Sequence, residues 1–108
     1  MANTFKSTAN VNIEVTSNTV YTCPSATQTT LIGMTLSNKS AGTVTANVFL
    51  RRSGTDYSII SNAPILTGSS LVPIGGDQKV VLQAADAVKV TVSANNAVDA
   101  IVSLLEIA

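Results

Sequence analysis

Side chains that carry out catalysis in proteins are few in this chain and widely spaced. The 108 residues include no histidine and one cysteine, Cys23. Histidine is the most common general base near neutral pH and the most common metal ligand. Without an imidazole, Cys23 has no partner for nucleophilic catalysis, and no cysteine–histidine zinc site can form. One cysteine also excludes a disulfide within the chain, so we interpret Cys23 as a small buried side chain at a strand end, before Pro24.

The six carboxylates are spread singly along the sequence. Asp56, Asp77 and Asp86 fall in expected turns, where an aspartate accepts hydrogen bonds from nearby backbone amides. Glu14 is interpreted as a solvated strand residue. No expected loop holds the clustered acids of a calcium site, and no pair is placed as in glycoside hydrolases. Because a strand follows Gly75-Gly76-Asp77, we interpret this segment as a turn and not as a phosphate loop, which needs a helix N-terminus. We expect no enzyme activity, no metal and no cofactor.

The surface of this protein is expected to be polar but weakly charged. Charged residues make up 11% of the chain and the net charge is zero, whereas soluble domains average about 25% charged residues. No basic stripe is present to neutralise phosphates, which argues against nucleic-acid binding. No apolar run reaches the length of a membrane span, and residues 1–6 lack the apolar stretch of a signal peptide, so we expect synthesis in a cytoplasm. With 45% hydrophobic residues, much of the surface is expected to be covered by other protein.

Alternation of residue types indicates the secondary structure. Thr, Ser and Asn alternate with Val, Ile, Leu and Ala, most clearly over residues 43–50 and 88–93. Period-two alternation gives each strand one apolar face and one hydroxyl or amide face. Turn residues recur every eight to twelve positions, a spacing typical of sandwiches and barrels. The sequence therefore predicts one all-β domain over residues 1–108, an antiparallel β-sandwich of jelly-roll type.

The expected strands follow from the runs between turn signals. Ser53-Gly54-Thr55 predicts a tight hairpin turn, and residues 84–86 are expected to join their flanking strands as a second hairpin. The last strand is apolar on both faces in places, which favours a central position in a sheet. Its sequence also fits helical spacing, but the β-branched residues and the preceding Asn95-Asn96 turn favour a strand. The first strand is expected within residues 4–15. The other expected strands are 20–23, 29–38, 43–52, 56–61, 79–83, 87–93 and 98–107, with short edge pieces at 65–66 and 70–73.

The core is expected to form where the apolar faces of two sheets meet. In the strand 29–38, Ile32, Met34 and Leu36 are assigned to the buried face, and Leu31 and Gly33 to the opposite face. The expected core residues are Ile32, Met34, Leu36, Val44, Val48, Leu50, Val88, Val90, Val92, Val102 and Leu104.

Four residues form the predicted interface with other chains: Phe49, Arg51, Arg52 and Tyr57. Arg51 and Arg52 are neighbours in a strand and point to opposite faces, so one should lean toward the edge of the core or toward another chain. A solvated strand end also explains the two arginines. Phe49 lies on the hydroxyl-bearing face beside Arg51 and is the best candidate for a contact anchor, although a second layer of core packing explains it nearly as well.

Several segments resemble a known family over nearly the whole chain. They are residues 1–6, 20–26, 31–38, 62–65, 68–71 and 98–107, together with 81–90, which is similar to a Leu-x-x-Gly-Asp-x-Val hairpin but has Ala85 at the glycine position. These segments resemble the small virion structural proteins of tailed bacteriophages, particularly those of marine and cyanobacterial phages. The resemblance implies a compact β-sandwich that assembles symmetrically on the head, neck or tail of a phage particle, and it brings no catalytic residue.

The leading hypothesis is therefore a virion structural protein made in the cytoplasm of a host bacterium. It is expected to be a head decoration (cement) protein or a head–tail or tail-associated component. Its expected partners are further copies of itself and the major capsid, neck or tail proteins of the same virion. The alternative is a receptor- or glycan-binding module of a tail fibre, which would gather aromatic, Asp and Asn side chains around a concave pocket.

Overall fold

A computed structural model describes residues 3–75 and 79–108 of the chain. These residues form strands and no helix. Of the expected turn at Gly75-Gly76-Asp77, only Gly75 lies within the described residues. The nine strands are β1 (Asn3–Asn10), β2 (Asn18–Thr22), β3 (Gln28–Asn38), β4 (Val44–Arg52), β5 (Thr55–Ile65), β6 (Ser70–Ile74), β7 (Val80–Leu82), β8 (Ala87–Val92) and β9 (Val98–Ile107).

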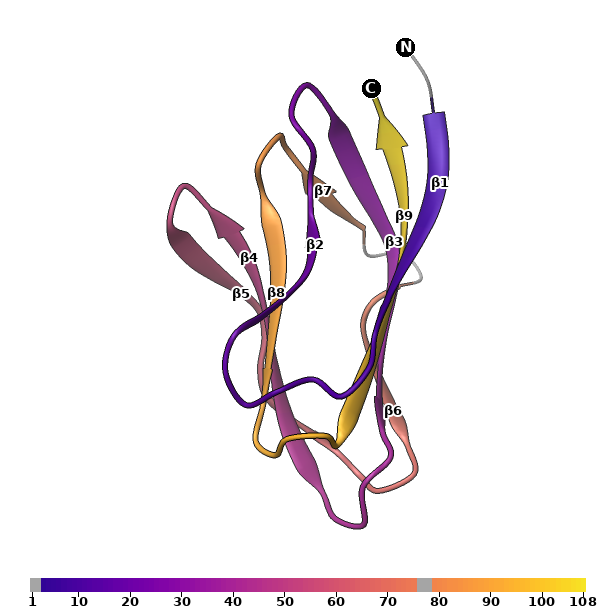
Figure 1. Cartoon of the computed structure of the whole chain (residues 1–108), viewed down its shortest axis with the longest axis vertical. Helices are drawn as coiled ribbons and strands as arrows, with labels where there is room; N and C mark the ends of the chain where they lie inside the picture. The colour runs from indigo at the N-terminus through magenta and orange to yellow at the C-terminus, as the bar shows by residue number, and fades with distance from the viewer. Residues whose placement is uncertain (1–2, 76–78) are drawn as a thin grey trace.

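The strands pair into two antiparallel sheets that pack face to face (Figure 1). Sheet A has the order β1-β9-β3-β6, with β7 also paired to β3, and sheet B has the order β2-β8-β4-β5. The chain passes repeatedly from one sheet to the other, and strands from both halves of the sequence interleave in each sheet. This is the Greek-key arrangement of a jelly roll, with β7 added. The predicted all-β, antiparallel sandwich of jelly-roll type is confirmed.

The core lies between the two sheets and is built by alternate residues of each strand. In β9, Val98, Ala100, Val102 and Leu104 are buried, while the residues between them are half-buried or exposed. Full burial of a Val or Leu side chain contributes about 1.5–3 kcal/mol, so these alternating residues supply most of the driving force for sheet packing. Leu50, another expected core residue, is partly buried and packs against the core. Nine of the expected core residues are buried: Met34, Leu36, Val44, Val48, Val88, Val90, Val92, Val102 and Leu104.

The prediction for Ile32 is wrong, because a β-bulge in β3 changes which residues face the core. Leu31 pairs with Leu104 and Gly33 with Ser103, so two steps along β3 match one step along β9. An extra residue in one strand moves the following residues to the other face relative to simple alternation. Leu31 is fully buried and Ile32 is half-buried.

The expected hairpin between residues 79–83 and 87–93 is also wrong. β7 pairs with β3 in sheet A, whereas β8 pairs with β2 and β4 in sheet B. The turn between them therefore carries the chain from one sheet to the other. Ala85, at the position where the resembled hairpin has glycine, has a φ of 72°, a left-handed conformation that side chains other than glycine adopt at a cost.

Two expected strand ends also differ from the structure. β1 ends at Asn10, so Glu14 lies in the connection to β2 and not in a strand. Of the expected edge piece at 65–66, Ile65 is the last residue of β5 and Leu66 lies in the connection to β6. β5 continues through Asn62, with a φ of 51°, and through Pro64. β5 lies at the edge of sheet B, and an edge strand tolerates the missing N–H of a proline.

Two further predictions are confirmed. β9 lies inside sheet A, between β1 and β3. Arg52 pairs with Thr55 across the β4–β5 hairpin, and the two residues between them, Ser53 and Gly54, both have positive φ. That is the two-residue turn that matches the twist of paired strands.

Candidate interaction surface

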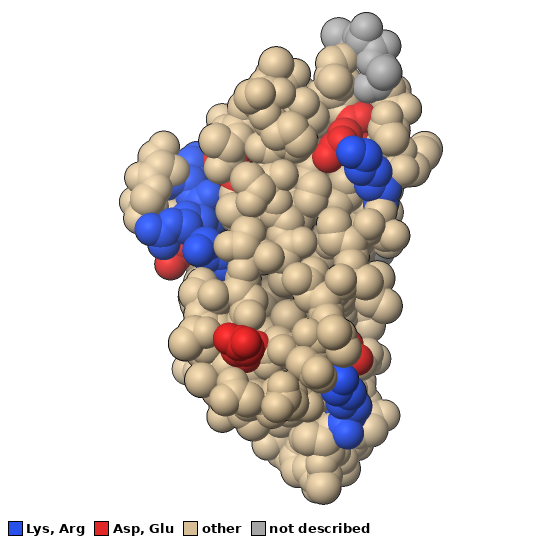
Figure 2. Space-filling model, in the orientation of Figure 1, with Lys and Arg blue, Asp and Glu red and all other residues tan. Residues whose placement is uncertain are grey.

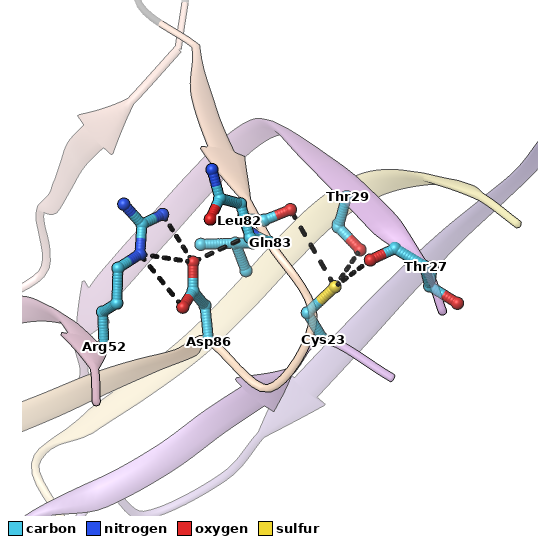
Figure 3. A network of polar contacts seen from close by, with 7 residues as sticks. All are labelled: Cys23, Thr27, Thr29, Arg52, Leu82, Gln83 and Asp86. Carbon is cyan, nitrogen blue, oxygen red and sulfur yellow. Dashed lines mark hydrogen bonds and ion pairs between the residues drawn. The ribbon is translucent and has the colours of Figure 1, made fainter. Parts of the chain in front are cut away.

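Arg51 and Arg52 occupy opposite faces at the end of β4, and each pairs with a different aspartate. Arg51 contacts Asp56 of β5 through an Nη1–Oδ1 distance of 3.0 Å, and both side chains are exposed. Arg52 donates from Nε to both carboxylate oxygens of Asp86, at 3.1 and 2.9 Å, and from Nη2 to Oδ2 at 2.6 Å (Figure 3). One arginine of the pair thus leans toward the edge of the core, as expected, and the other remains on the outer face of sheet B.

Asp86 is a buried carboxylate that fixes the turn between β7 and β8. Its Oδ2 also accepts a hydrogen bond of 2.8 Å from the backbone N–H of Gln83. The Arg52 hydrogen bonds hold the pKa of Asp86 below its usual value, and those same bonds raise the pKa of Arg52. An aspartate with a lowered pKa stays ionised near neutral pH and is not a general acid. Asp86 therefore holds the local turn amide, as interpreted, and in addition ties that turn to β4.

Cys23 lies just after β2, buried at the same end of the sandwich. Its Sγ is 3.3 Å from the carbonyl oxygen of Thr27 and 3.3 Å from Oγ1 of Thr29 (Figure 3). The backbone N–H of Cys23 donates to the carbonyl of Asp86, and that of Ala85 donates to the carbonyl of Cys23. The thiol is free and buried, which confirms its interpretation as a small buried side chain at a strand end.

A second polar cluster joins the two sheets near Tyr21. The Tyr21 hydroxyl of sheet B donates to Oε2 of Glu106 in sheet A at 2.5 Å and lies 2.9 Å from Oγ1 of Thr29. Nζ of Lys6 lies 2.9 Å from the other oxygen of Glu106. Burial, together with the hydrogen bond to Glu106, raises the pKa of Tyr21 to about 12. The hydrogen bonds from Tyr21 and Lys6 lower the pKa of Glu106. Near neutral pH Tyr21 is therefore protonated and Glu106 ionised, and the hydrogen bond between them joins sheet B to sheet A.

The remaining predicted interface residues lie on the β4–β5 hairpin, whose closed end splays away from sheet A (Figure 1). Phe49 is half-buried on the outer face of sheet B, between Ser58 of β5 and Lys89 of β8. Tyr57 is exposed near the tip. The structure thus brings Phe49 and Arg51 together on one outer face and engages Arg52 within the chain. Tyr57 lies opposite Leu50, on the other face of the hairpin. The role of these four residues as an interface stays a prediction.

Sequence reasoning missed a second surface, the outer face of sheet A. Residues from four strands meet there in register, in the row Phe5, Leu105, Thr30 and Val81, and a second row contains Ala9, Ile101 and Thr35. Phe5, Val81 and Ile101 are 75%, 56% and 52% exposed. Among the outward positions of these paired strands only Asp99, at one end, is charged. We call these two rows the sheet A face. Its signal in the sequence is the run of apolar residues in β9, which also indicates the central place of that strand.

Charge on the described surface is gathered into separate groups with uncharged surface between them (Figure 2). Much of this charge is cancelled locally by four ion pairs, Lys6–Glu106, Lys39–Asp99, Arg51–Asp56 and Arg52–Asp86. Within residues 3–75 and 79–108, no cluster of three or more acidic, Cys or His side chains is placed to hold a metal. No helix in this part of the chain is long and apolar enough to span a membrane.

Three shallow depressions on the described surface gather neither paired acids nor aromatic side chains. The largest lies at the end of the sandwich near the C-terminus, between the 26–28 and 83–84 segments and residues 107–108. The two others contain one acid each, Glu14 and Asp99. Aromatic side chains line none of the three.

Comparison with known proteins identifies similar folds and no family. No family model and no curated protein matches the sequence. The structure is similar to a chain of the Bacillus endospore appendages, a family of disulfide-linked pili, with a TM-score of 0.56 and 14% identity over 96% of this chain and 85% of that one. It is also similar to a chain of the T13 viral particle of IBDV, with a TM-score of 0.53 and 9% identity over 96% of this chain and 30% of that one. At these identities the likeness shows a shared fold.

Proposed function

We propose that this chain is a structural protein that assembles into a larger particle, and specifically a virion protein of a tailed bacteriophage. It acts as a head decoration protein or as a head–tail or tail-associated component. Copies bury weakly charged surface against one another and against neighbouring capsid, neck or tail proteins. The phage assignment rests on the sequence resemblance. The general role in assembly is supported by the surface of the molecule.

The sheet A face is the observation that carries the proposal. Phe5, Val81 and Ile101 are large apolar side chains, each more than half exposed. Phe5 and Val81 lie in one row of the sheet A face and Ile101 lies in the other. Single exposed apolar residues are common, but contiguous exposed patches mark interaction sites. The polar residues between them carry hydroxyl groups, which are less costly to desolvate than charges. Such a face is suited to burial against protein.

The fold and the two similar structures support the same general role. Both similar chains come from large assemblies, a pilus and a viral particle. The pili are described as disulfide-linked, whereas the one cysteine of this chain is buried and free. We therefore propose that contacts in this assembly are non-covalent and apolar. Contacts with few charges tolerate salt, because screening acts mainly on exposed ionic groups.

We further propose that the protein is not an enzyme. Asp86, Asp99 and Glu106 are each held by a cation and a further hydrogen bond. A tail-fibre module that binds a receptor or a glycan is the weaker alternative. Sugar sites are usually built on aromatic platforms in a concave site, and the three depressions described above lack aromatic side chains.

The mass of the purified protein in solution tests the role in assembly. Light scattering over a range of concentrations should give species larger than the 11.1 kDa chain. Ile101→Lys places a charge within the sheet A face without touching the core, so it should shift the protein toward the monomer. Leu66→Lys is the matched control, because Leu66 is also an aliphatic residue more than half exposed, and it lies in the β5–β6 connection. A protein that stays monomeric, or two lysine variants that behave alike, would contradict the use of this face.

The phage assignment requires a separate measurement. Particles purified from a lysate of the phage that encodes the chain should contain the protein in fixed proportion to the major capsid protein, by quantitative mass spectrometry. Absence from such particles would refute a virion role and leave the self-assembly result standing.

A further inference from the structure

β1 differs from every other strand of the described residues in its burial. All eight of its residues, Asn3–Asn10, are exposed or half-buried. Each of the other eight strands has at least one buried residue. β1 is nevertheless fully paired, with eight residue pairs along β9. It is therefore held mainly by its backbone ladder and contributes no side chain to the interior.

Only a few side-chain interactions add to that ladder. Nζ of Lys6 contacts Glu106, and Oγ1 of Thr8 donates to the carbonyl oxygen of Val20 at 3.1 Å. The Lys6 side chain is itself about half exposed. Phe5, the largest side chain of β1, points outward on the sheet A face. If β1 left its position, Glu106 would keep the Tyr21 hydrogen bond and lose Lys6.

The segment that follows β1 is anchored. The backbone N–H of Asn12 donates to Oδ1 of Asp99 at 2.9 Å, and that of Ile13 donates to the carbonyl of Val98 at 2.8 Å. Ile13 is buried in the core cluster. Asn12 has a φ of 55° and follows the exposed Val11. This places a sharp bend and a fixed point directly after a weakly held strand.

β9 does not depend on β1 for its place in the sandwich. Its inner side chains Val102 and Leu104 are buried against sheet B, and its other edge pairs with β3 over ten residues. Release of β1 would uncover the free edge of a rigid strand. An open strand edge of this kind is a template for an identical strand of another chain.

We propose that β1 is exchanged between copies in the assembled state, so that the Asn3–Asn10 strand of one chain pairs with β9 of a second. This inference rests on the self-assembly proposed above and names its partner, another copy of the chain. The incoming strand would restore the same register, and its Lys6 would restore the ion pair to Glu106. Exchange of an identical element has a low free-energy cost, because the incoming strand forms the same hydrogen bonds and packing as the strand it replaces. Eight residues in an extended strand reach about 26 Å beyond the bend at Asn12, at about 3.3 Å per residue.

A cross-linking experiment distinguishes an exchanged from an unexchanged β1. In a Cys23→Ala background, Ser7→Cys and Ser103→Cys place two thiols opposite one another on β1 and β9. Gly33→Cys with Ser103→Cys is the matched control, because it keeps the thiol on β9 and joins that strand to β3 on the same outer face. A Cβ at Gly33 has room, since its nearest neighbour would be the carbonyl oxygen of Ile74 at 3.7 Å. Each protein is concentrated until light scattering shows assembly, treated with a short bis-maleimide, and run on a denaturing gel.

Exchange predicts that most of the 7/103 variant is joined into covalent multimers, and that the 33/103 variant is joined within single chains. Assembled protein in which both pairs are joined within single chains would overturn the exchange and leave self-assembly intact. Protein that stays monomeric at every concentration would overturn the exchange together with the self-assembly on which it rests.

Discussion

Arg51→Met and Arg52→Met form a matched pair of substitutions that tests whether the Arg52–Asp86 contact stabilises the fold. The two arginines are adjacent in β4, and each lies within 3.0 Å of an aspartate. They differ in their partners: Asp56 is 40% exposed, whereas Asp86 is 5% exposed. Methionine keeps most of the aliphatic length of arginine, so the substitutions mainly remove the charge and its hydrogen bonds.

The expected losses of stability differ because of this burial. Exposed ion pairs contribute about 0.2–1 kcal/mol, so Arg51→Met should cost less than about 1 kcal/mol. Arg52→Met leaves Asp86 buried, with the Gln83 amide as its remaining donor. Breaking a fully buried pair costs about 3–5 kcal/mol, and a hydrogen bond to a charged group about 1.5–3 kcal/mol. Because the Arg52 side chain is 38% exposed, we expect a loss of about 2–3 kcal/mol.

Urea denaturation at pH 7 measures these losses directly. The protein should be dilute enough that assembly does not add to its apparent stability. For a domain of this size the Arg52→Met loss corresponds to a fall in Tm of roughly 10 °C. Equal losses in the two variants would refute the argument that burial of the carboxylate gives the Arg52–Asp86 contact its larger value.

Acidification gives an independent check on the same pair. The pKa of Asp86 in the folded protein lies below its usual value of 3.8, because of Arg52 first. A carboxylate whose pKa is lowered by folding stabilises the protein at pH values above its unfolded pKa, and this stabilisation is lost as the pH falls through the folded pKa. The difference between the wild-type chain and Arg52→Met should therefore be full at pH 7 and shrink below about pH 4. A difference that stays constant down to pH 2 would mean that lost packing, and not charge, explains the effect.

Three further predictions concern the core, the thiol and the outer face of sheet B. Leu31→Ala should lower the free energy of unfolding by about 2–5 kcal/mol and Ile32→Ala by clearly less, because the bulge buries Leu31 and not Ile32. Urea denaturation should rank the two losses in that order, and the reverse ranking would contradict the bulge. The buried thiol of Cys23 should react with a thiol reagent only at the rate of unfolding, and assembled protein should run as a single chain on a non-reducing gel. Phe49→Ala and Arg51→Ala should weaken assembly, measured by light scattering, while lowering Tm only slightly. A fall in Tm that matches the loss of assembly would show that these side chains support the core.

Features that depend on nearest neighbours along the chain were predictable from the sequence. The alternation in 43–50 and 88–93 identified β4 and β8 together with their buried faces. The glycine in Ser53-Gly54-Thr55 identified the two-residue turn, since a type of turn with two positive φ values strongly selects residues that tolerate them. Period-two patterns and tight turns are local, so a single sequence contains the information that fixes them.

Features that depend on pairing between distant segments were not predictable in the same way. The bulge that buries Leu31 exists because β3 must match β9, far along the chain, over its whole length. Likewise, residues 80–82 pair with β3, whereas the expected hairpin assigned them to β8. Neither choice of partner leaves a signature in the alternation of the segment itself. The same reason hid the sheet A face, because Phe5, Ile101 and Val81 come together only through strand order.

The polar, uncharged residues that dominate the sequence have two physical roles, and only the structure separates them. Asn38 and Thr29 are buried. Asn38 donates from Nδ2 to the carbonyl oxygens of Gly42 and Ile65, both at 2.8 Å, and so joins the β3–β4 connection to the end of β5. In the described residues no buried side-chain N or O atom lacks a hydrogen-bond partner. Such residues stabilise the fold, because an unpaired buried polar group is costly. Hydroxyl groups that point outward, such as that of Thr35 beside Ile101, are the ones available to a neighbouring chain, so assembly should respond to changes at Thr35, and folding to changes at Thr29.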